Sequence, residues 1–137
     1  MDTEGLFVPE TVEAARRRYE ALGSTAQVVV RETTRAMEFD AEEYDSRVTG
    51  EVIETARDAL FASMLEVRVG TRAEFDDWRT AHDFEVTEVG SEHVDGVVWH
   101  AAPATGEAVA ATYDEKRRAA IDTLRRQAFG RIYREVL

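Results

Sequence analysis

The sequence predicts an α+β fold, with a helical N-terminal half packed against a four-stranded sheet half. Through residues 9–64, apolar residues recur at the spacing of a helix face. From Leu65 onward the spacing of apolar residues changes to two, which is typical of strands. The stretch 94–113, VDGVVWHAAPATGEAVAATY, has only Asp95 and Glu107 as charges, in a chain that is 33% charged. These observations place the core on the sheet half and make the helical half its cover.

The first helix is expected to begin at Pro9, because the fixed φ of proline suits the first turn of a helix. It is expected to run to about Leu22, where Gly23 ends it. A second helix is expected over residues 25–38. The three valines at 28–30 are β-branched and leave a strand open as the alternative. The helical spacing of the apolar residues in this segment favours the helix.

Two further helices complete the helical half. Asp40 followed by Glu43 resembles a capping box and predicts a short helix through Tyr44. A longer helix is expected over residues 50–64, where the apolar side chains fall on one face. Residues 1–8 are expected to form a loose arm, for which Leu6, Phe7 and Val8 could serve as an anchor.

The sheet half, residues 65–137, is expected to follow the order β-α-β-β-β-α. Alternating apolar and charged residues predict its first strand over 65–69. Thr71 with Glu74 matches a capping box, so a helix is expected from there to about His82.

Three strands and a final helix follow. The first of these strands is expected over residues 84–89. The other two, over 94–102 and 107–113, form a hairpin around a Pro-Ala-Thr-Gly turn, because proline and glycine provide the φ angles that such a turn needs. Asp114 is expected to cap the final helix, which ends near Val136.

The length of 137 residues predicts one domain, with a helical part at 9–64 and a sheet part at 65–137. No apolar run is long enough to span a membrane and the N-terminus has no signal-peptide pattern, which favours the cytoplasm. The chain has no cysteine, which excludes disulfides, thiolate metal sites and a cysteine nucleophile.

The charge composition indicates an intracellular protein of a salt-loving organism. The formal net charge is −11, and the basic residues are sixteen arginines and a single lysine, Lys116. Molar salt screens repulsion between carboxylates beyond about 3 Å, so a dense acidic surface is tolerated there and keeps the protein in solution. In that setting an acidic balance argues only weakly against a nucleic-acid partner.

The three histidines, His82, His93 and His100, could in principle hold zinc or iron together with a carboxylate. No pair of them has the spacing that places two ligands on one face of a helix or strand. No G-x-S-x-G elbow, Walker loop or G-x-G-x-x-G sequence is present. We therefore expect no catalytic residues, no metal and no cofactor, and a metal-dependent enzyme that uses these histidines remains the third interpretation.

A basic C-terminal segment contrasts with the rest of the chain. Residues 114–137 carry a net charge of +3 and residues 1–113 a net charge of −14. The arginines ring the predicted helix, so we expect their stems to cover the core edge and their heads to pair with the protein's own carboxylates. A nucleic-acid-associated accessory protein that uses these arginines is the alternative function.

One strand of the hairpin has a tryptophan and a histidine at adjacent positions. Trp99 is expected in the core, and it would mark a docking surface if it were exposed. The candidate interaction surface comprises Trp99 and His100 on the strand and Arg126 and Arg134 on the C-terminal helix.

Four segments resemble a small family of haloarchaeal proteins of unknown function: VPETVEAARRRYEALG, YDSRVTGEVIETARDALFASMLEVRVGT, VVWHAAP and LRRQAFGRIYREVL. The resemblance covers nearly the whole chain and implies a halophilic origin, but no activity or site. The leading interpretation is therefore a non-catalytic interaction or regulatory module with an unidentified protein partner. A nucleic-acid partner is less expected, and the oligomeric state is left open.

Overall fold

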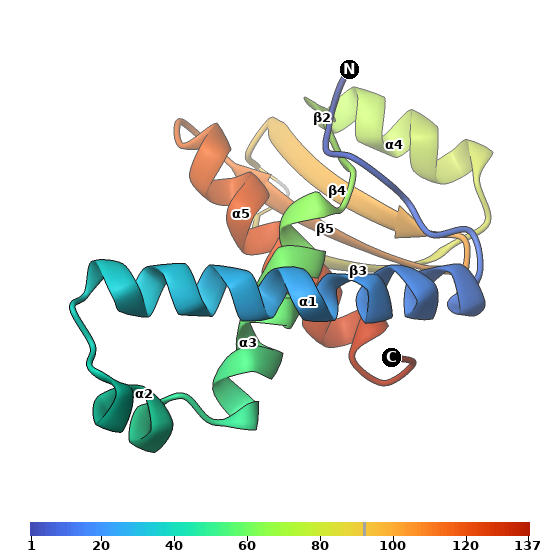
Figure 1. Ribbon diagram of the computed structural model, residues 1–137. Helices are drawn as coiled ribbons and strands as arrows, with labels where there is room; N and C mark the ends of the chain where they lie inside the picture. The colour runs from blue at the N-terminus through green and yellow to red at the C-terminus, as the bar shows by residue number, and fades with distance from the viewer. Residues whose placement is uncertain (92) are drawn as a thin grey trace.

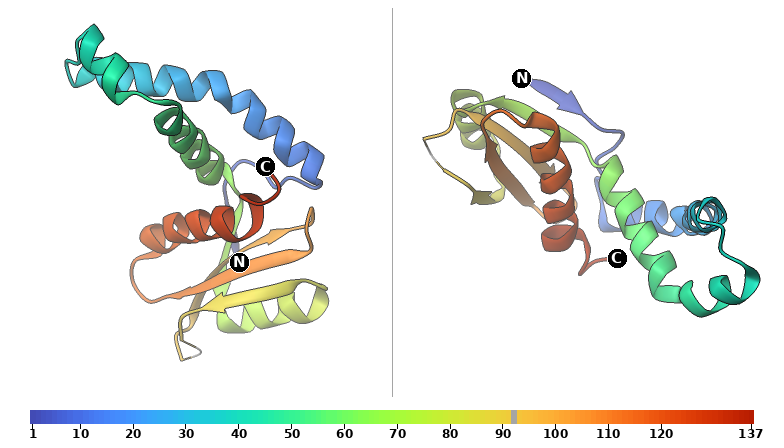
Figure 2. Two further views of the ribbon diagram at one scale, coloured as in Figure 1. Left: turned by 90° about the horizontal axis from the view of Figure 1, so that it is seen from below. Right: turned by 90° about the vertical axis from the view of Figure 1, so that its left-hand side faces the viewer.

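A computed structural model describes residues 1–91 and 93–137, which form a five-stranded mixed sheet with helices on both faces (Figures 1 and 2). The α+β class is confirmed. In chain order the elements are β1 (Asp2–Glu4), α1 (Val12–Ala36), α2 (Ala41–Arg47), α3 (Gly50–Met64), β2 (Val67–Thr71), α4 (Arg72–Ala81), β3 (Glu85–Val89), β4 (Gly96–Ala102), β5 (Glu107–Tyr113), α5 (Arg117–Ala128) and a π-helical turn η1 (Phe129–Tyr133).

The sheet order is β1-β2-β4-β5-β3, so the predicted hairpin of β4 and β5 lies at its centre. All neighbouring strands are antiparallel except β3 and β5, which are parallel. In β4, Trp99 is opposite Arg68 of β2 on one side and Ala110 of β5 on the other. This register fixes which side chains share a face with Trp99.

The prediction of four strands is wrong by one, because residues 2–4 form the edge strand β1 beside β2. Thr3 is opposite Arg68 in this pair. The backbone N–H of Phe7 then donates to the carbonyl of Met64 at 3.1 Å. The expected loose arm is thus held by backbone pairing, and Phe7, one of its expected anchor residues, packs against the core. Residues 2–4 do not alternate between apolar and polar, so the sequence does not reveal this strand.

The first two predicted helices are one helix, α1, and residues 28–30 are helical. Gly23 does not end it. This glycine is buried, and a Cβ atom there would collide with the guanidinium of Arg57 on α3. The glycine therefore leaves room for the Arg57 guanidinium against α1.

Local signals fix several other boundaries. Helix α3 spans the predicted residues, and the capping box of Thr71 and Glu74 is present at α4. Asp40 caps α2 by accepting from the N–H of Glu43 at 2.8 Å. The final helix differs from prediction, since it begins at Arg117 and not at Asp114, no described side chain caps it, and it becomes π-helical after Ala128.

The two faces of the sheet carry separate cores. One core joins α1, α3 and α5 to the sheet around Phe61, whose ring makes edge contacts with four other aromatic rings, namely Phe7, Tyr19, Phe129 and Tyr133. The other core lies under α4, where Phe75 and Trp78 pack on Trp99. In Figure 2, α4 is the helix that covers that face.

Part of the helical half extends beyond the sheet. The C-terminal half of α1, the short α2 and the N-terminal half of α3 project away from it (Figures 1 and 2). We call this segment, residues 28–56, the helical arm. In the described chain, each helix is too short or too polar to cross a membrane.

Candidate functional site

The candidate residues Trp99 and His100 lie buried on opposite faces of the sheet. Trp99 is fully buried and His100 is 1% exposed, so neither reaches a surface where a partner could dock. The Nδ1–H of His100 donates to the carbonyl of Glu66 at 2.6 Å, and its Nε2 accepts from the hydroxyl of Tyr133 at 2.7 Å. These two bonds satisfy both ring nitrogens and hold β4 to the start of β2 and to η1.

Burial keeps this histidine–tyrosine pair neutral. Loss of water around the ring lowers the pKa of His100 to about 4, against an ordinary value of 6.5, and burial raises the pKa of the Tyr133 hydroxyl. A neutral, fully bonded imidazole in a packed core has no free lone pair for a metal and no proton to exchange with a substrate. The pair is therefore a structural link.

The other two histidines lie elsewhere. His82 follows α4, where its Nδ1–H donates to the carbonyl of Trp78 at 2.8 Å and its ring stacks on the Trp78 indole. His93 is exposed in the loop before β4. Across residues 1–91 and 93–137, no three His, Asp or Glu side chains gather as a metal site.

Three C-terminal arginines make contacts with other parts of the protein. Arg117 contacts Asp2 at 3.1 Å and Glu4 at 3.3 Å, and Arg118 contacts Glu4 at 2.6 Å, which ties α5 to the edge strand β1. Arg125 donates from its Nε to the carbonyl of Leu65 at 2.9 Å. These contacts agree with the expectation that the arginine heads pair within the protein.

The two arginines named as candidates are exposed. Arg126 donates to the hydroxyl of Thr123 at 3.3 Å, and the guanidinium of Arg134 lies over the ring of Phe129 at 5.4 Å. Both heads remain accessible to a partner on the side of α5 and η1.

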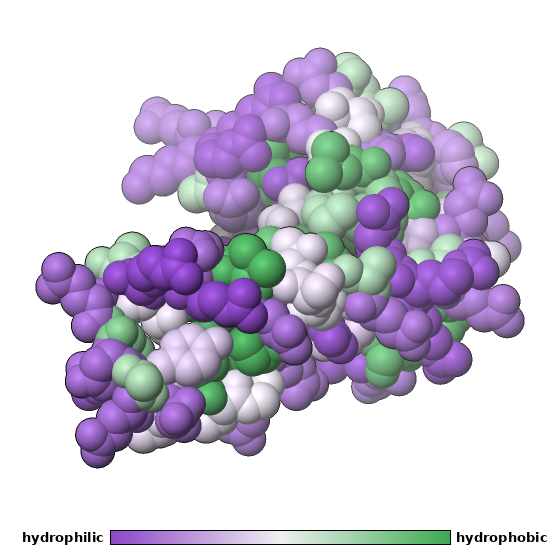
Figure 3. Space-filling model, in the orientation of Figure 1, coloured by the Kyte–Doolittle hydropathy of each residue, from purple (hydrophilic) through white to green (hydrophobic). Residues whose placement is uncertain are grey.

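The helical arm holds an apolar groove between α1 and α3, closed at one end by α2. Its volume is about 430 Å³, and it is lined by Val29, Val30, Thr33, Thr34, Met37, Phe39, Arg47, Val48, Val52, Thr55, Ala56 and Ala59. Val29 is 41% exposed, Met37 61% and Val52 39%. Figure 3 shows hydrophobic side chains between hydrophilic ones over the arm. The sequence showed these residues as apolar stripes, and a stripe alone does not tell which member stays uncovered.

A second cavity, which we call the aromatic pocket, lies at the C-terminal end of α4. Its volume is about 350 Å³, and its lining comes from four separate stretches of the chain: Val8, Glu10, Glu66, Arg68, Trp78, His82, Phe84, Trp99, Ala101 and Pro103. The indole N–H groups of Trp78 and Trp99 are buried and have no hydrogen-bond partner among the described residues. Sequence reasoning missed this pocket, because only the tertiary fold brings the segments together.

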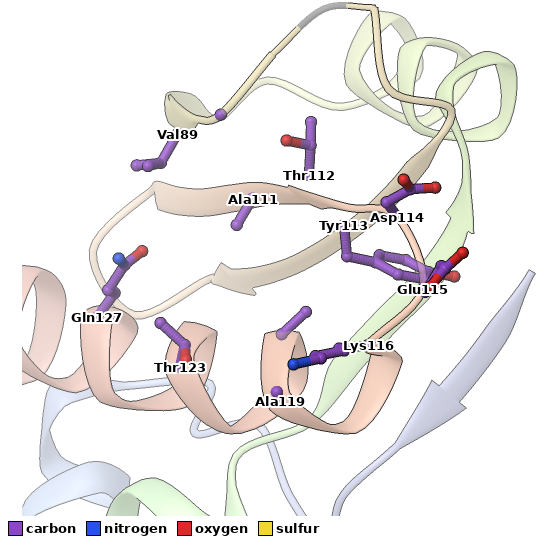
Figure 4. A pocket seen from close by; sticks show the side chains of 12 residues that line it. Val89, Ala111, Thr112, Tyr113, Asp114, Glu115, Lys116, Ala119, Thr123 and Gln127 are labelled. Atoms are coloured by element: carbon purple, nitrogen blue, oxygen red, sulfur yellow. The ribbon is translucent and has the colours of Figure 1, made fainter.

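A third, open pocket lies between the end of β5 and the start of α5 (Figure 4). Its volume is about 450 Å³, and its polar lining includes Thr112, Asp114, Glu115, Lys116, Thr123 and Gln127. Asp114 and Glu115 stand beside the first turn of α5, where their charges repel an anion. The pocket thus lacks the electrostatics of a phosphate site, although it adjoins a helix N-terminus.

Comparison with known proteins gives a family match without a function. A model described as a family of unknown function (DUF5809) matches residues 6–134. No curated protein matches the chain, and no solved structure does.

Proposed function

The chain belongs to this family of unknown function, DUF5809, and from its structure we propose that it is a non-catalytic interaction module whose helical arm docks a basic amphipathic helix of a partner protein. The groove between α1 and α3 carries the proposal. Three of its large apolar side chains, Val29, Met37 and Val52, are each more than a third exposed. Exposed apolar side chains gathered in one groove are typical of a docking site, since burying them gains about 25 cal/mol per Å².

The shape of the groove favours a helix as the occupant. Two neighbouring helices present ridges with a furrow between them, and a third helix fits such a furrow with apolar residues at i, i+3, i+4 and i+7. The lining is almost wholly apolar, with threonines and Arg47 as its polar members. An amphipathic helix would bury its apolar stripe there and leave its polar face in water.

The charge around the groove favours basic flanks on that helix. Between Glu38 and Glu54 the arm has seven acidic residues and one basic residue, Arg47. Complementary charge raises the association rate and rejects acidic partners. The same acidic rim repels a second copy of this chain, which disfavours self-association through the arm.

A medium of molar salt forms part of the proposal, on the observation of net charge −11 with a single lysine. At that ionic strength charges act only over about 3 Å. Apolar burial then supplies most of the affinity, and close charge contacts at the rim select the partner. In this proposal the exposed Arg126 of α5 and Arg134 after η1 form a second contact, away from the arm.

The test uses two synthetic helical peptides with the same leucine stripe, one with lysines on its polar face and one with glutamates. Fluorescence anisotropy at about 0.2 M KCl should show the lysine peptide binding at least about tenfold more tightly. The difference should shrink at about 2 M KCl, because salt screens the rim charges.

Two adjacent valines provide a matched pair of variants. Val29 lines the groove, whereas its neighbour Val28 is 50% exposed outside the groove lining. Val29→Asp should weaken binding of the lysine peptide at least about tenfold, and Val28→Asp should leave it unchanged. Equal effects of the two variants would refute the groove. A dimer in sedimentation that Val29→Asp dissociates would assign the groove to a second copy and overturn the proposed partner.

A further inference from the structure

The two edge strands of the sheet differ in length and in how their charges are held. Strand β1 is three residues long, and its Asp2 and Glu4 carboxylates are bound by Arg117 and Arg118 of α5. Strand β3 is five residues long, and its one neighbour in the described sheet is β5. Very short edge strands resist pairing with another chain, whereas a longer edge strand presents a row of unpaired N–H and C=O groups. An additional strand can therefore pair with β3.

The register of β3 shows which of its backbone groups are unpaired. The N–H of Glu85 donates to the carbonyl of Gly106 at 2.9 Å, so the backbone groups of Glu85 face β5. Backbone groups of alternate residues face the same side of a strand, so every second residue from Glu85 onward bonds to β5. The N–H and C=O groups of Val86 and Glu88 then point outward from the sheet. They offer two donors and two acceptors to an additional strand.

One end of β3 is apolar on the face that α5 covers. Val89 is half-buried there and lines the open pocket between β5 and α5. Ala111 of β5 and Ala119 and Ala120 of α5 belong to the same lining. Figure 4 shows Val89 and Ala111 on the sheet side of this opening and Ala119 on the helix side. An aliphatic side chain placed opposite Val89 would bury this apolar surface.

The other end of β3 is acidic on the same face. Glu85 is paired in register with Glu107 of β5, and like charges at such positions repel each other. A cavity of about 270 Å³ there is lined by both carboxylates, by Glu135 and by a single cation, Arg131. Within the described part of the chain none of the three carboxylates forms an ion pair. A lysine or arginine side chain would reduce their repulsion.

We infer that β3 binds an extended, basic segment of a partner protein as an additional antiparallel strand, on a surface independent of the helical arm. An apolar residue of this segment lies opposite Val89, and a lysine or arginine four positions later lies opposite Glu85. Main-chain hydrogen bonds supply the affinity in this mode of binding, and the alternate side chains supply the specificity. Antiparallel pairing is the arrangement because it is slightly more stable per residue than parallel pairing.

The same charge pattern disfavours a second copy of this chain as the occupant. Two copies of β3 that pair antiparallel around a twofold axis at Thr87 would place Glu85 of each copy opposite Val89 of the other. Each carboxylate would then lie at an apolar end, and neither acidic end would gain a cation. A basic segment of another protein satisfies both ends of the strand.

The test uses a capped seven-residue peptide of threonines with valine at position 2 and lysine at position 6, opposite Val89 and Glu85. The N–H groups of positions 3 and 5 then face the backbone of Glu88 and Val86, and the N–H of position 4 faces away. N-methylation at position 5 should weaken binding at least about tenfold in fluorescence anisotropy. N-methylation at position 4 is the matched control and should leave binding unchanged. Equal effects of the two, or no binding of the unmethylated peptide at millimolar concentration, would overturn the inference.

Charge reversal at the acidic end tests the specificity. Glu85→Lys changes an exposed side chain, and it should weaken binding of the lysine peptide at least about tenfold. The same variant should bind a peptide with glutamate at position 6 more tightly than wild type does. Glu20→Lys, at an exposed position of α1 away from β3, makes the same change in net charge and should bind both peptides as wild type does. Equal effects of Glu85→Lys and Glu20→Lys would show a general charge attraction and refute the site.

Two further measurements identify the occupant and the surface. Val29→Asp in the helical arm should bind the lysine peptide as wild type does, so failure of the groove proposal leaves this result unaffected. A loss of binding in Val29→Asp would place the peptide on the arm and overturn the assignment to β3. Sedimentation of the free protein should show no dimer that the peptide dissociates. Such a dimer would assign the β3 edge to a second copy and overturn the proposed partner.

Discussion

The Nε2 atom of His100 lies 2.7 Å from the hydroxyl oxygen of Tyr133, and this hydrogen bond joins the centre of the sheet to the π-helical turn η1. Tyr133 belongs to a helix whose regular α-helical path ends at Ala128. A π-helical turn shifts the side chains that follow it around the helix axis. We attribute the reach of the Tyr133 hydroxyl to this change of helical phase.

Tyr133→Phe should destabilise the protein by about 1–3 kcal/mol, because the variant leaves the Nε2 of His100 buried without a donor. Urea denaturation followed by circular dichroism measures this change. Tyr113→Phe is the matched control, since the hydroxyl of Tyr113 makes no hydrogen bond among the described residues. Similar losses in the two variants would mean that the His100 contact contributes nothing specific.

The same histidine should make stability fall in mild acid. Burial holds the pKa of His100 at about 4 in the folded protein, whereas the unfolded chain has the ordinary value of 6.5. Below pH 6.5 the unfolded state therefore binds a proton that the folded state does not, and the native state loses stability until the pH reaches about 4. The pKa difference corresponds to about 3 kcal/mol over this window.

The measurement compares the unfolding free energy of wild type and His100→Gln at pH 7.5 and pH 4.5. Carboxylates titrate in the same range, but they are common to both proteins. The wild type should lose about 2–3 kcal/mol more than the variant between the two pH values. An equal loss in both proteins would show that His100 titrates normally in the fold.

Leu124→Ala should cost about 2–5 kcal/mol, because Leu124 is fully buried where α5 packs on the sheet and a cavity would remain. This is a large share of the stability of a small protein. Arg126→Ala, two residues further along α5 and exposed, should change the stability by no more than about 0.5 kcal/mol. An unchanged midpoint for Leu124→Ala would contradict the packing of α5.

The elements that the sequence predicted well are those fixed by neighbouring residues. Helix α3 and strand β5 have the predicted bounds, and the capping box of Thr71 and Glu74 depends on residues three positions apart. Strand β1 depends instead on pairing with β2, more than sixty residues away, and its acidic residues show no alternation. Local patterns therefore fixed the helices better than the edge of the sheet.

Contacts between distant segments, which local patterns do not predict, matter even more for the candidate sites. Trp99 was recognised as a core residue or a docking residue, and only the position of α4 over it decides that it is buried. The aromatic pocket forms only where β2, the end of α4 and β4 come together in the fold. The spacing of residues along the chain does not predict that they meet. Gly23 shows how a local signal fails, because it lies inside α1 beside the Arg57 guanidinium and does not end the helix.

Stability should rise with salt, because 28 acidic residues face 17 basic ones and their repulsion is unscreened at low ionic strength. Thermal melts at about 0.1 M and 2 M KCl should give a clearly higher midpoint in the concentrated salt. Salt also strengthens apolar burial in general, so the size of the increase alone does not identify its cause. Two sets of charge variants separate the causes.

Neutralising four exposed acids of the arm, by Glu42→Gln, Asp45→Asn, Glu51→Gln and Glu54→Gln, changes the net charge from −11 to −7. If repulsion between carboxylates causes the salt dependence, this variant should melt higher than wild type at 0.1 M KCl and gain less from 2 M KCl. Neutralising four exposed arginines to glutamine, at Arg17, Arg31, Arg126 and Arg131, changes the net charge to −15 and should steepen the dependence. Both sets remove four charges from exposed positions, so solvation changes are similar and only the sign of the net charge shift differs. Identical salt responses of the two variants would show that the stabilisation by salt does not arise from the acidic surface.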